Sequence, residues 1–241
     1  RHVGMGRDRR STAPGVRGRR RRARRLPPDE RRARLIESAI RVFARRGIGE
    51  ARHAEIAKDA GVSLATTFVY FPTRQELVDA VLSEVARFYA DMARDIHVRE
   101  DLPAGEVLLA HANTFLRSTE THPDYARVWL DWSTSIRDAV WPKYLAFQDS
   151  VEEWISRTIA RGHRDRSVHD RLDPHLGARL MISAAHMVVQ MQFSGRPQRQ
   201  IQAFVETVMR AIVAAMSGKP SPSLVRGGRS GSSRRAQAGE T

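Results

Sequence analysis

The sequence predicts an all-α protein of about nine helices, with a small N-terminal three-helix unit followed by a larger helical unit. Apolar residues recur at helical spacing through most of residues 27–217, whereas alternation with period two never lasts more than a few positions. Proline, aspartate, serine or threonine stands where several of these segments begin, and glycine or proline stands where several end. The periodicity and the boundary residues therefore agree on the fold class.

The first helix follows two prolines. Asp29, directly after them, is expected to act as its N-cap. Residues 47–49, Gly-Ile-Gly, are expected to end the helix. The apolar residues between these limits recur at intervals typical of one buried helix face: Leu35, Ile36, Ala39, Ile40 and Phe43.

Two short helices are expected next. The first covers about 53–60 and ends at Gly61, which can adopt the positive φ of a tight turn. Ser63 is expected to cap the second, over about 64–70, and Pro72 to break it. Two short helices joined by a tight turn are typical of a helix-turn-helix, here over about 53–72.

The larger unit is expected to open with a capping box. Thr73 and Glu76 have the Thr-x-x-Glu spacing that starts a helix, here a long one reaching to about residue 95. Five more helical segments follow, near residues 103–120, 124–135, 140–162, 173–193 and 197–216.

The net charge of +14 is concentrated in two tails. Residues 1–25 hold eleven arginines and one acid, and residues 218–241 hold five basic residues and one acid, whereas residues 26–217 are neutral overall. Both tails have few apolar residues to bury, so we expect an Arg-rich disordered arm at 1–26 and a disordered basic tail at 218–241. Basic tails around a neutral core indicate contact with a polyanion, although idle solvated tails have the same composition.

Composition also excludes several classes of protein. The absence of cysteine excludes disulfides and thiolate metal sites, and no apolar stretch of about 18 residues could span a membrane. The N-terminus lacks the apolar run of a signal peptide, so a cytoplasmic, nucleoid-associated location is expected. We find no phosphate-binding glycine loop, nucleophile elbow or zinc-protease motif. No enzyme activity, metal, cofactor or membrane partner is expected.

The helix-turn-helix has side chains suited to duplex DNA. Free N–H groups at the Ser63-capped helix start can face a phosphate. Small side chains at Leu64, Ala65, Thr66 and Thr67 are expected to enter a major groove, where hydroxyls contact base edges and methyl groups contact thymine. An ordinary helical hairpin in a core is the alternative interpretation of the same pattern.

Residues 34–82 resemble the DNA-binding domain of the TetR family over its whole length. The segments ARRGIG (44–49), VYFPTRQELVDAVL (69–82) and VWLDWSTSIRDAVWP (128–142) extend the likeness to the LuxR/HapR/SmcR-type quorum-sensing master regulators of vibrios. The resemblance implies an Ω-shaped homodimer that places two recognition helices in the major groove of a near-palindromic DNA site. It also implies that arginines before the first helix enter the adjacent minor groove.

The motif and the resemblance together give the candidate DNA-contacting residues: Arg22, Arg24, Arg25, His53, Ser63, Leu64, Ala65, Thr66, Thr67, Val69, Tyr70 and Thr73. One of them departs from the resembling regulators, which carry an asparagine where this chain has Val69. Asparagine can form two hydrogen bonds with adenine and valine cannot, so we expect a different base preference at that position.

The resemblance further implies a cavity for a small apolar ligand in the larger unit. The candidate wall residues are Phe88, Met92, Tyr125, Trp129, Trp132, Trp154, His186 and Gln190. Aromatic residues at this density are also typical of ordinary core packing. The last two helices carry apolar stripes, from Met181 to Val188 and from Ile201 to Val213, that could form a four-helix dimer interface. The alternative is that these stripes face the core of their own subunit.

We therefore expect a helix-turn-helix DNA-binding domain at 27–75 and a helical regulatory and dimerisation domain at 76–217. The function expected is sequence-specific transcriptional regulation, with double-stranded DNA, a second copy and an apolar ligand as partners. The alternative is a nonspecific architectural nucleic-acid-binding protein driven by its Arg-rich tails. A helical enzyme or carrier is a third alternative, but it lacks catalytic motifs.

Overall fold

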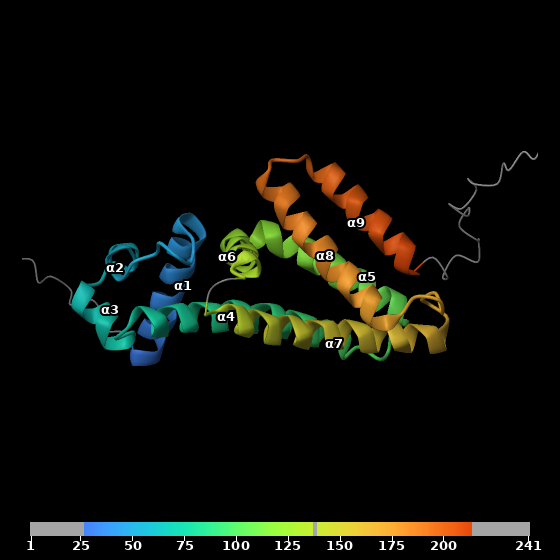
Figure 1. Ribbon diagram of the computed structural model, residues 1–241, viewed down its shortest axis with the longest axis horizontal. Helices are drawn as coiled ribbons and strands as arrows, with labels where there is room; N and C mark the ends of the chain where they lie inside the picture. Colours follow the sequence, from blue (N-terminus) through green and yellow to red (C-terminus); the bar gives the residue numbers. More distant parts are fainter. Residues whose placement is uncertain (1–26, 137–138, 214–241) are drawn as a thin grey trace, which may run out of the picture.

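The computed structural model describes residues 27–136 and 139–213, and it shows a small and a large helical body joined by one long helix (Figure 1). All regular secondary structure in these residues is α-helical, as predicted. The predicted arms at 1–26 and 218–241 lie outside the described residues. The helices are α1 Pro28–Arg46, α2 His53–Ala60, α3 Leu64–Tyr70, α4 Arg74–His97, α5 Ala104–Thr121, α6 Pro123–Thr134, α7 Trp141–Asp165, α8 Pro174–Phe193 and α9 Gln198–Val213.

The start of α1 differs from the sequence prediction. Pro27, rather than Asp29, is the N-cap, and Pro28 is the first helical residue. Proline suits this position because its fixed φ fits the helix and its missing N–H would have no partner there. Asp29 instead lies in the first turn, where its charge favours the positive end of the helix dipole.

The turn between α2 and α3 forms as predicted. Gly61 has φ 67° and ψ 32°, a left-handed conformation that L side chains adopt only at a cost. The Val62 N–H donates to the Ala57 carbonyl oxygen at 3.0 Å and so closes α2. Ile56 and Ala57 are buried against α1, so the turn holds α3 at a fixed angle to the other two helices of the small body.

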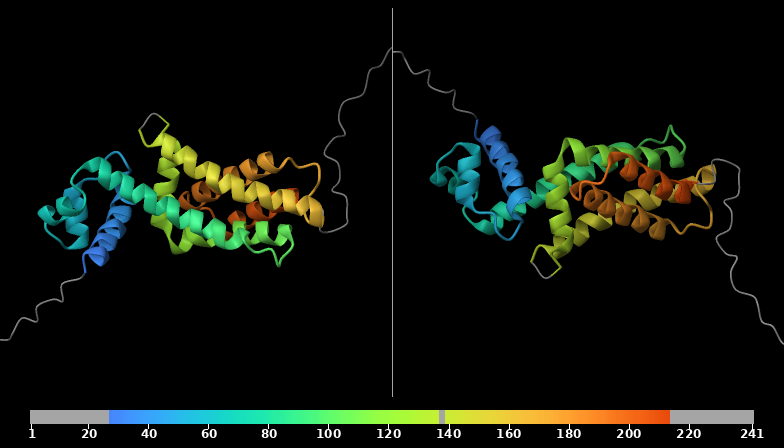
Figure 2. Two further views of the ribbon diagram at one scale, coloured as in Figure 1. Left: turned by 90° about the horizontal axis from the view of Figure 1, so that it is seen from below. Right: turned by 90° about the horizontal axis from the view of Figure 1, so that it is seen from above.

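The long helix α4 connects the two bodies (Figure 2). It begins at the predicted cap, where the Glu76 N–H donates to Thr73 Oγ1 at 3.1 Å. Its buried residues, among them Leu77, Val81 and Val85, face first α1 and then the larger body. The larger body packs α4, α5, α7, α8 and α9 around a shared apolar core, with α6 lying across the end nearest to α1.

Polar contacts fix α6 and α4 to the loop after α1. Asp131 Oδ2, on α6, accepts a hydrogen bond from the Ile48 N–H at 2.7 Å. The Arg74 guanidinium, at the start of α4, donates to the carbonyl oxygens of Ile48 at 2.5 Å and Gly49 at 2.7 Å. Lys143, on α7, pairs with Asp79 on α4. Asp131 on α6 and Arg74 on α4 therefore both hold the loop at 47–49 by hydrogen bonds.

No helix in the described part of the chain is both long enough and apolar enough to cross a membrane.

Candidate nucleic-acid interface and apolar cavity

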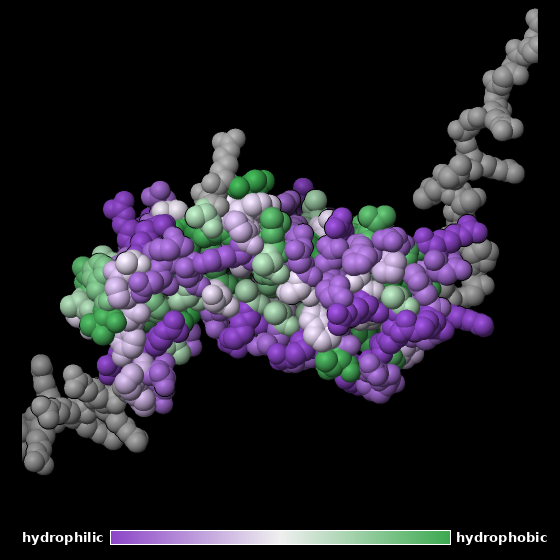
Figure 3. All heavy atoms as spheres, turned by 60° about the horizontal axis from the view of Figure 1, so that its bottom comes forward, coloured by the Kyte–Doolittle hydropathy of each residue, from purple (hydrophilic) through white to green (hydrophobic). Residues whose placement is uncertain are grey.

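The outer face of α3 carries exposed apolar side chains. Leu64 is 45% exposed, Phe68 44% and Val69 76%, and apolar atoms gather at the end of the molecule where α3 lies (Figure 3). Ala65 is also exposed on this helix. Apolar groups in water at a helix surface are unfavourable unless a partner covers them, so this face has the character of a contact surface.

Hydroxyl groups flank this apolar face. Ser63 caps α3 by accepting from the Thr66 N–H at 3.1 Å, and its hydroxyl lies 2.8 Å from that of Thr66. Tyr70 is half-buried at the other end of the helix. Thr73 is exposed, and its hydroxyl donates to Glu76 Oε1 at 3.3 Å. These four residues lie along one short helix and its two ends.

Two of the predicted contact residues lie inward instead. Thr67 is fully buried, and its hydroxyl has no hydrogen-bond partner among the described residues. His53 is 9% exposed, its Nε2 lies 2.9 Å from the Phe71 carbonyl oxygen, and its ring stacks on that of Phe68 with centroids 4.5 Å apart. Both side chains hold α3 against the small body, which explains why neither reaches the surface.

Phe68 is the residue that the sequence prediction missed. It lies four positions after Leu64, so the two side chains share one face of α3. The stacked His53 ring supports Phe68 from behind. The spacing of Leu64 and Phe68 was the available signal, but a phenylalanine at helical spacing is more often a core residue.

Three basic side chains in the C-terminal half of α1 are engaged within the small body. Arg41 and Arg45 lie 2.6 Å and 3.1 Å from the carboxylate of Asp59, and Arg46 lies 2.7 Å from Glu55. Burial raises the pKa of Asp59, but hydrogen bonds from Arg41 and Arg45 outweigh it and hold the pKa below its usual value. The predicted minor-groove residues lie outside the described part of the chain: Arg22, Arg24 and Arg25.

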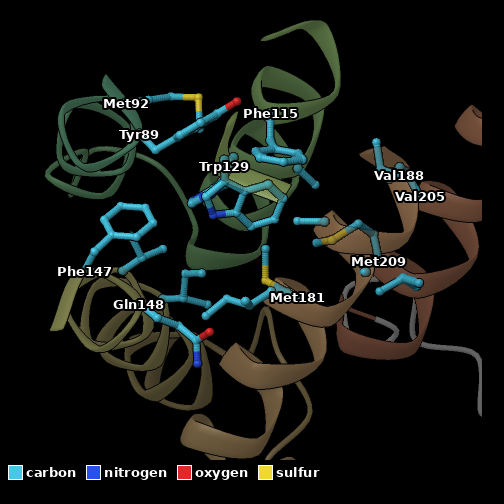
Figure 4. Close-up of a pocket in the computed structure, with 18 of the residues that line it drawn as sticks. Tyr89, Met92, Phe115, Trp129, Phe147, Gln148, Met181, Val188, Val205 and Met209 are labelled. Carbon is cyan, nitrogen blue, oxygen red and sulfur yellow. The ribbon is translucent and has the colours of Figure 1, made fainter. Parts of the chain in front are cut away.

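An apolar cavity of about 70 Å³ lies inside the larger body, between α4, α5, α6, α7, α8 and α9 (Figure 4). Its walls are mainly aromatic rings, thioethers and branched aliphatic side chains, including Phe115, Trp129, Met181, Val188 and Met209. Among the residues that the structure describes, no aspartate, glutamate, lysine or arginine lines the cavity. Such a wall favours an apolar guest and disfavours a charged one.

Two of the eight predicted wall residues, Met92 and Trp129, line this cavity. The structure places the other six outside the lining: Phe88, Tyr125, Trp132, Trp154, His186 and Gln190. Phe88 and Tyr125 pack against each other with ring centroids 4.7 Å apart, and Gln190 is exposed on α8. Trp154 is half-buried on α7.

The remaining two predicted wall residues, Trp132 and His186, make structural contacts elsewhere in the protein. Trp132 donates from Nε1 to the Val140 carbonyl oxygen at 3.0 Å and so fixes the connection between α6 and α7. The His186 ring contacts that of Trp129 in a tilted arrangement, with centroids 4.3 Å apart and an interplanar angle of 32°. Its Nε2 lies 3.0 Å from the Tyr144 hydroxyl and its Nδ1 2.8 Å from the Ile182 carbonyl oxygen. Both ring nitrogens are thus engaged within the protein.

A pair of buried histidines beside the cavity was not predicted. His97 Nε2, on α4, lies 2.6 Å from Nδ1 of His111 on α5, and His111 lines the cavity. Burial lowers the pKa of His97 to about 3 and that of His111 to about 4, so both rings are neutral near pH 7. Tyr89, also in the lining, has a buried hydroxyl with no partner among the described residues.

Comparisons with known proteins agree with this arrangement. Residues 35–81 match the family model described as bacterial regulatory proteins, tetR family. The transcriptional regulator LuxR of Vibrio harveyi is 39% identical over 142 residues, which cover 57% of this chain and 69% of LuxR. The nicotine-responsive repressor HdnoR of Paenarthrobacter nicotinovorans is 26% identical over 196 residues, which cover 80% of this chain and 84% of the repressor.

Solved structures share the fold. A TetR-like regulator from Rhodococcus sp. RHA1 superposes with a TM-score of 0.66 at 19% identity, covering 81% of this chain and all of that one. FadR from Bacillus subtilis, in complex with stearoyl-CoA, gives 0.63 at 19% identity, covering 76% of this chain and 98% of FadR. The helix-turn-helix, the all-α architecture and the likeness to LuxR lead to one conclusion: the chain belongs to the TetR family of DNA-binding transcriptional regulators, which are not enzymes.

Proposed function

We propose that the protein binds a near-palindromic DNA site as a homodimer and represses or activates transcription according to the promoter. In this proposal residues 27–75 contact DNA and residues 76–217 dimerise and bind an apolar ligand. The observation that carries it is α3, a capped helix fixed from behind by buried Thr67 and His53 and exposed in front. A rigid helix with a free face needs little ordering when it enters a major groove.

Each face residue has a role in this proposal. Leu64, Ala65 and Val69 contact thymine methyl groups, while Ser63 and Thr66 contact phosphates or base edges. Tyr70 and Thr73 contact the DNA backbone. Phe68 adds a large apolar contact that the sequence prediction did not include.

The basic arm extends the same interface. Arg22, Arg24 and Arg25 precede α1 and are proposed to enter the minor groove, whose negative potential attracts arginine. The 1–25 segment also increases the number of released counterions, so the affinity should fall steeply with salt.

Much of the two apolar stripes expected to form the dimer interface is buried within the subunit, including Met181, Val188, Ile201 and Val205. Dimerisation is supported instead by a second, exposed apolar stripe on α8. Leu176 is 63% exposed, and Leu180 and Met187 are each 43% exposed at positions four and eleven residues further on. These positions share one helix face, and a second copy could cover it in a four-helix arrangement with α9. A two-fold dimer also matches a palindromic site, because each half-site receives one recognition helix.

Control by a ligand is supported by the cavity. One relative is named as nicotine-responsive, and one structural neighbour holds stearoyl-CoA. The apolar wall of this chain favours an uncharged apolar ligand. The likeness to quorum-sensing regulators makes gene expression that depends on cell density the physiological output to test. Action on the chromosome implies a cytoplasmic, nucleoid-associated location.

The test is selection of genomic DNA fragments by the purified full chain at physiological salt, followed by sequencing of the bound fraction. A short imperfect palindrome in the bound fragments is the expected result. Phe68→Ala should lower affinity for that palindrome about tenfold or more, because about 1.5–3 kcal/mol of apolar contact is lost. Leu145→Ala, which removes an exposed leucine from α7, is the matched control and should bind as the unmodified chain does.

Deletion of residues 1–25 separates the two candidate functions. If α3 determines specificity, the shortened chain should select the same palindrome with lower affinity. Bound DNA without a shared motif, together with loss of all binding after the deletion, would favour the nonspecific architectural protein instead.

A further inference from the structure

The two buried histidines form a continuous chain of hydrogen bonds that ends at the cavity. Thr158 Oγ1, on α7, lies 3.0 Å from the Trp154 carbonyl oxygen and 2.7 Å from His97 Nδ1. His97 Nε2 lies 2.6 Å from His111 Nδ1. His97 is 6% exposed and His111 7%, so the chain runs through the protein interior.

The direction of this chain follows from counting donors. A hydroxyl has one hydrogen, and a carbonyl oxygen can only accept, so a Thr158 hydroxyl bonded to Trp154 must accept from His97 Nδ1. A neutral imidazole that donates from Nδ1 has its lone pair on Nε2. His97 Nε2 therefore accepts from His111 Nδ1, and His111 in turn has its lone pair on Nε2.

We propose that His111 Nε2 accepts a hydrogen bond from the bound ligand, which is therefore an uncharged apolar molecule carrying a hydroxyl group. This inference rests on the proposed ligand-controlled function and specifies the chemical class of the ligand. His111 lines the cavity, and its Nδ1 is turned towards His97. Nε2 is the ring nitrogen that His97 does not engage, and we assign it to the ligand.

The surrounding wall explains why the ligand is uncharged. Both histidines are neutral, and no aspartate, glutamate, lysine or arginine of the described part of the chain lines the cavity. A carboxylate or an ammonium group would therefore lose its hydration without an ionic partner there. A hydroxyl loses less hydration and regains one hydrogen bond. Figure 4 shows the Gln148 amide turned away from the centre of the cavity.

The experiment is calorimetric titration of the full chain with straight-chain primary alcohols from propanol to pentanol, which suit a cavity of about 70 Å³. Each alcohol is paired with a methyl ether of the same number of heavy atoms, which can accept a hydrogen bond but cannot donate one. The alcohol should bind about tenfold more tightly than its ether. The ether cannot donate to His111 Nε2, so it loses that hydrogen bond and leaves the nitrogen unpaired. Matched fatty acid anions should bind more weakly than either probe.

Two variants test the histidine chain itself. His111→Phe should reduce the alcohol-to-ether ratio to about one by weakening the alcohol alone. Thr158→Val lies outside the cavity lining and removes the hydroxyl that fixes the direction of the chain. The His111 ring can then present either a donor or an acceptor, so this variant should also bring the ratio to about one. It keeps the test valid if His111→Phe fails to fold.

The controls change two other polar residues of the wall, Tyr89 and Gln148, whose side chains are not hydrogen-bonded to His186. Tyr89→Phe and Gln148→Leu should change the affinities for alcohol and ether equally, and therefore leave their ratio as it is. Absence of binding by every probe, an alcohol-to-ether ratio near one in the unmodified chain, or loss of the ratio in Tyr89→Phe would overturn the inference. DNA binding is measured on the same samples. Loss of DNA binding would count against the proposed function rather than against the inference about the ligand.

Discussion

Replacing Asp131 by alanine would remove the hydrogen bond that ties α6 to the small body. Asp131 Oδ2 accepts from the Ile48 N–H at 2.7 Å, and Ile48 is only 6% exposed. The Ile48 N–H would therefore lose its hydrogen-bond partner in a place that solvent scarcely reaches. Leaving such a donor unpaired costs more than the net value of an ordinary hydrogen bond.

The magnitude follows from the geometry. A hydrogen bond to a charged acceptor contributes about 1.5–3 kcal/mol, and Asp131 is partly exposed, so we expect Asp131→Ala to lower the free energy of unfolding by about 2 kcal/mol. For a chain of this size, that corresponds to a fall in Tm of roughly 4–8 °C. Urea denaturation followed by circular dichroism measures the free energy of unfolding. Asp131→Asn keeps an amide oxygen as acceptor, so its free energy of unfolding should fall by about half as much.

The matched control is Asp149→Ala on α7. Asp149 is exposed, so this change removes the same charge without a tertiary contact and should stay within about 0.5 kcal/mol. Equal stability of the two alanine variants would refute the role assigned to Asp131.

Three more predictions concern the turn, the cap and the histidine pair. Gly61→Val forces a β-branched residue to φ 67° and should cost about 1–2 kcal/mol of unfolding free energy and most of the DNA affinity; an unchanged melting temperature contradicts it. Ser63→Ala removes the α3 cap and should cost about 1 kcal/mol, with Ser63→Thr as the conservative control. Because burial lowers the pKa of His97 and His111 from 6.5, the unfolded chain binds more protons below that pH. The free energy of unfolding should therefore be highest above pH 6.5 and fall towards pH 4, with a shallower slope in His111→Phe.

Local signals in the sequence predicted the helices of the small body well. The ranges 53–60 and 64–70 agree with α2 and α3, because Ser63 and Gly61 fix these ends through contacts with residues at most four positions away. Asp29 was wrong as N-cap because the two prolines before it already satisfy the requirements of a helix start.

The orientation of side chains was harder to predict than the helices. Thr67 was placed outside for its hydroxyl, yet α3 turns it into the core and turns Phe68 outward. Six predicted wall residues lie outside the cavity because the rotation of each helix depends on its packing partners, which no local signal specifies. His97 and His111 meet only because α4 and α5 cross, so their pairing is a property of the tertiary structure.

The position of α6 explains how a ligand in the cavity could change DNA binding. Trp129 lines the cavity, and Asp131, two residues later, points about 200° further round the helix towards Ile48. Under the proposed ligand control, a guest that displaces Trp129 would move the anchor of the loop between α1 and α2. Coupling of this kind is reciprocal, so DNA must change ligand affinity by the same factor by which ligand changes DNA affinity. Asp131→Ala, which leaves both sites intact but breaks the connection, should lower the two factors together.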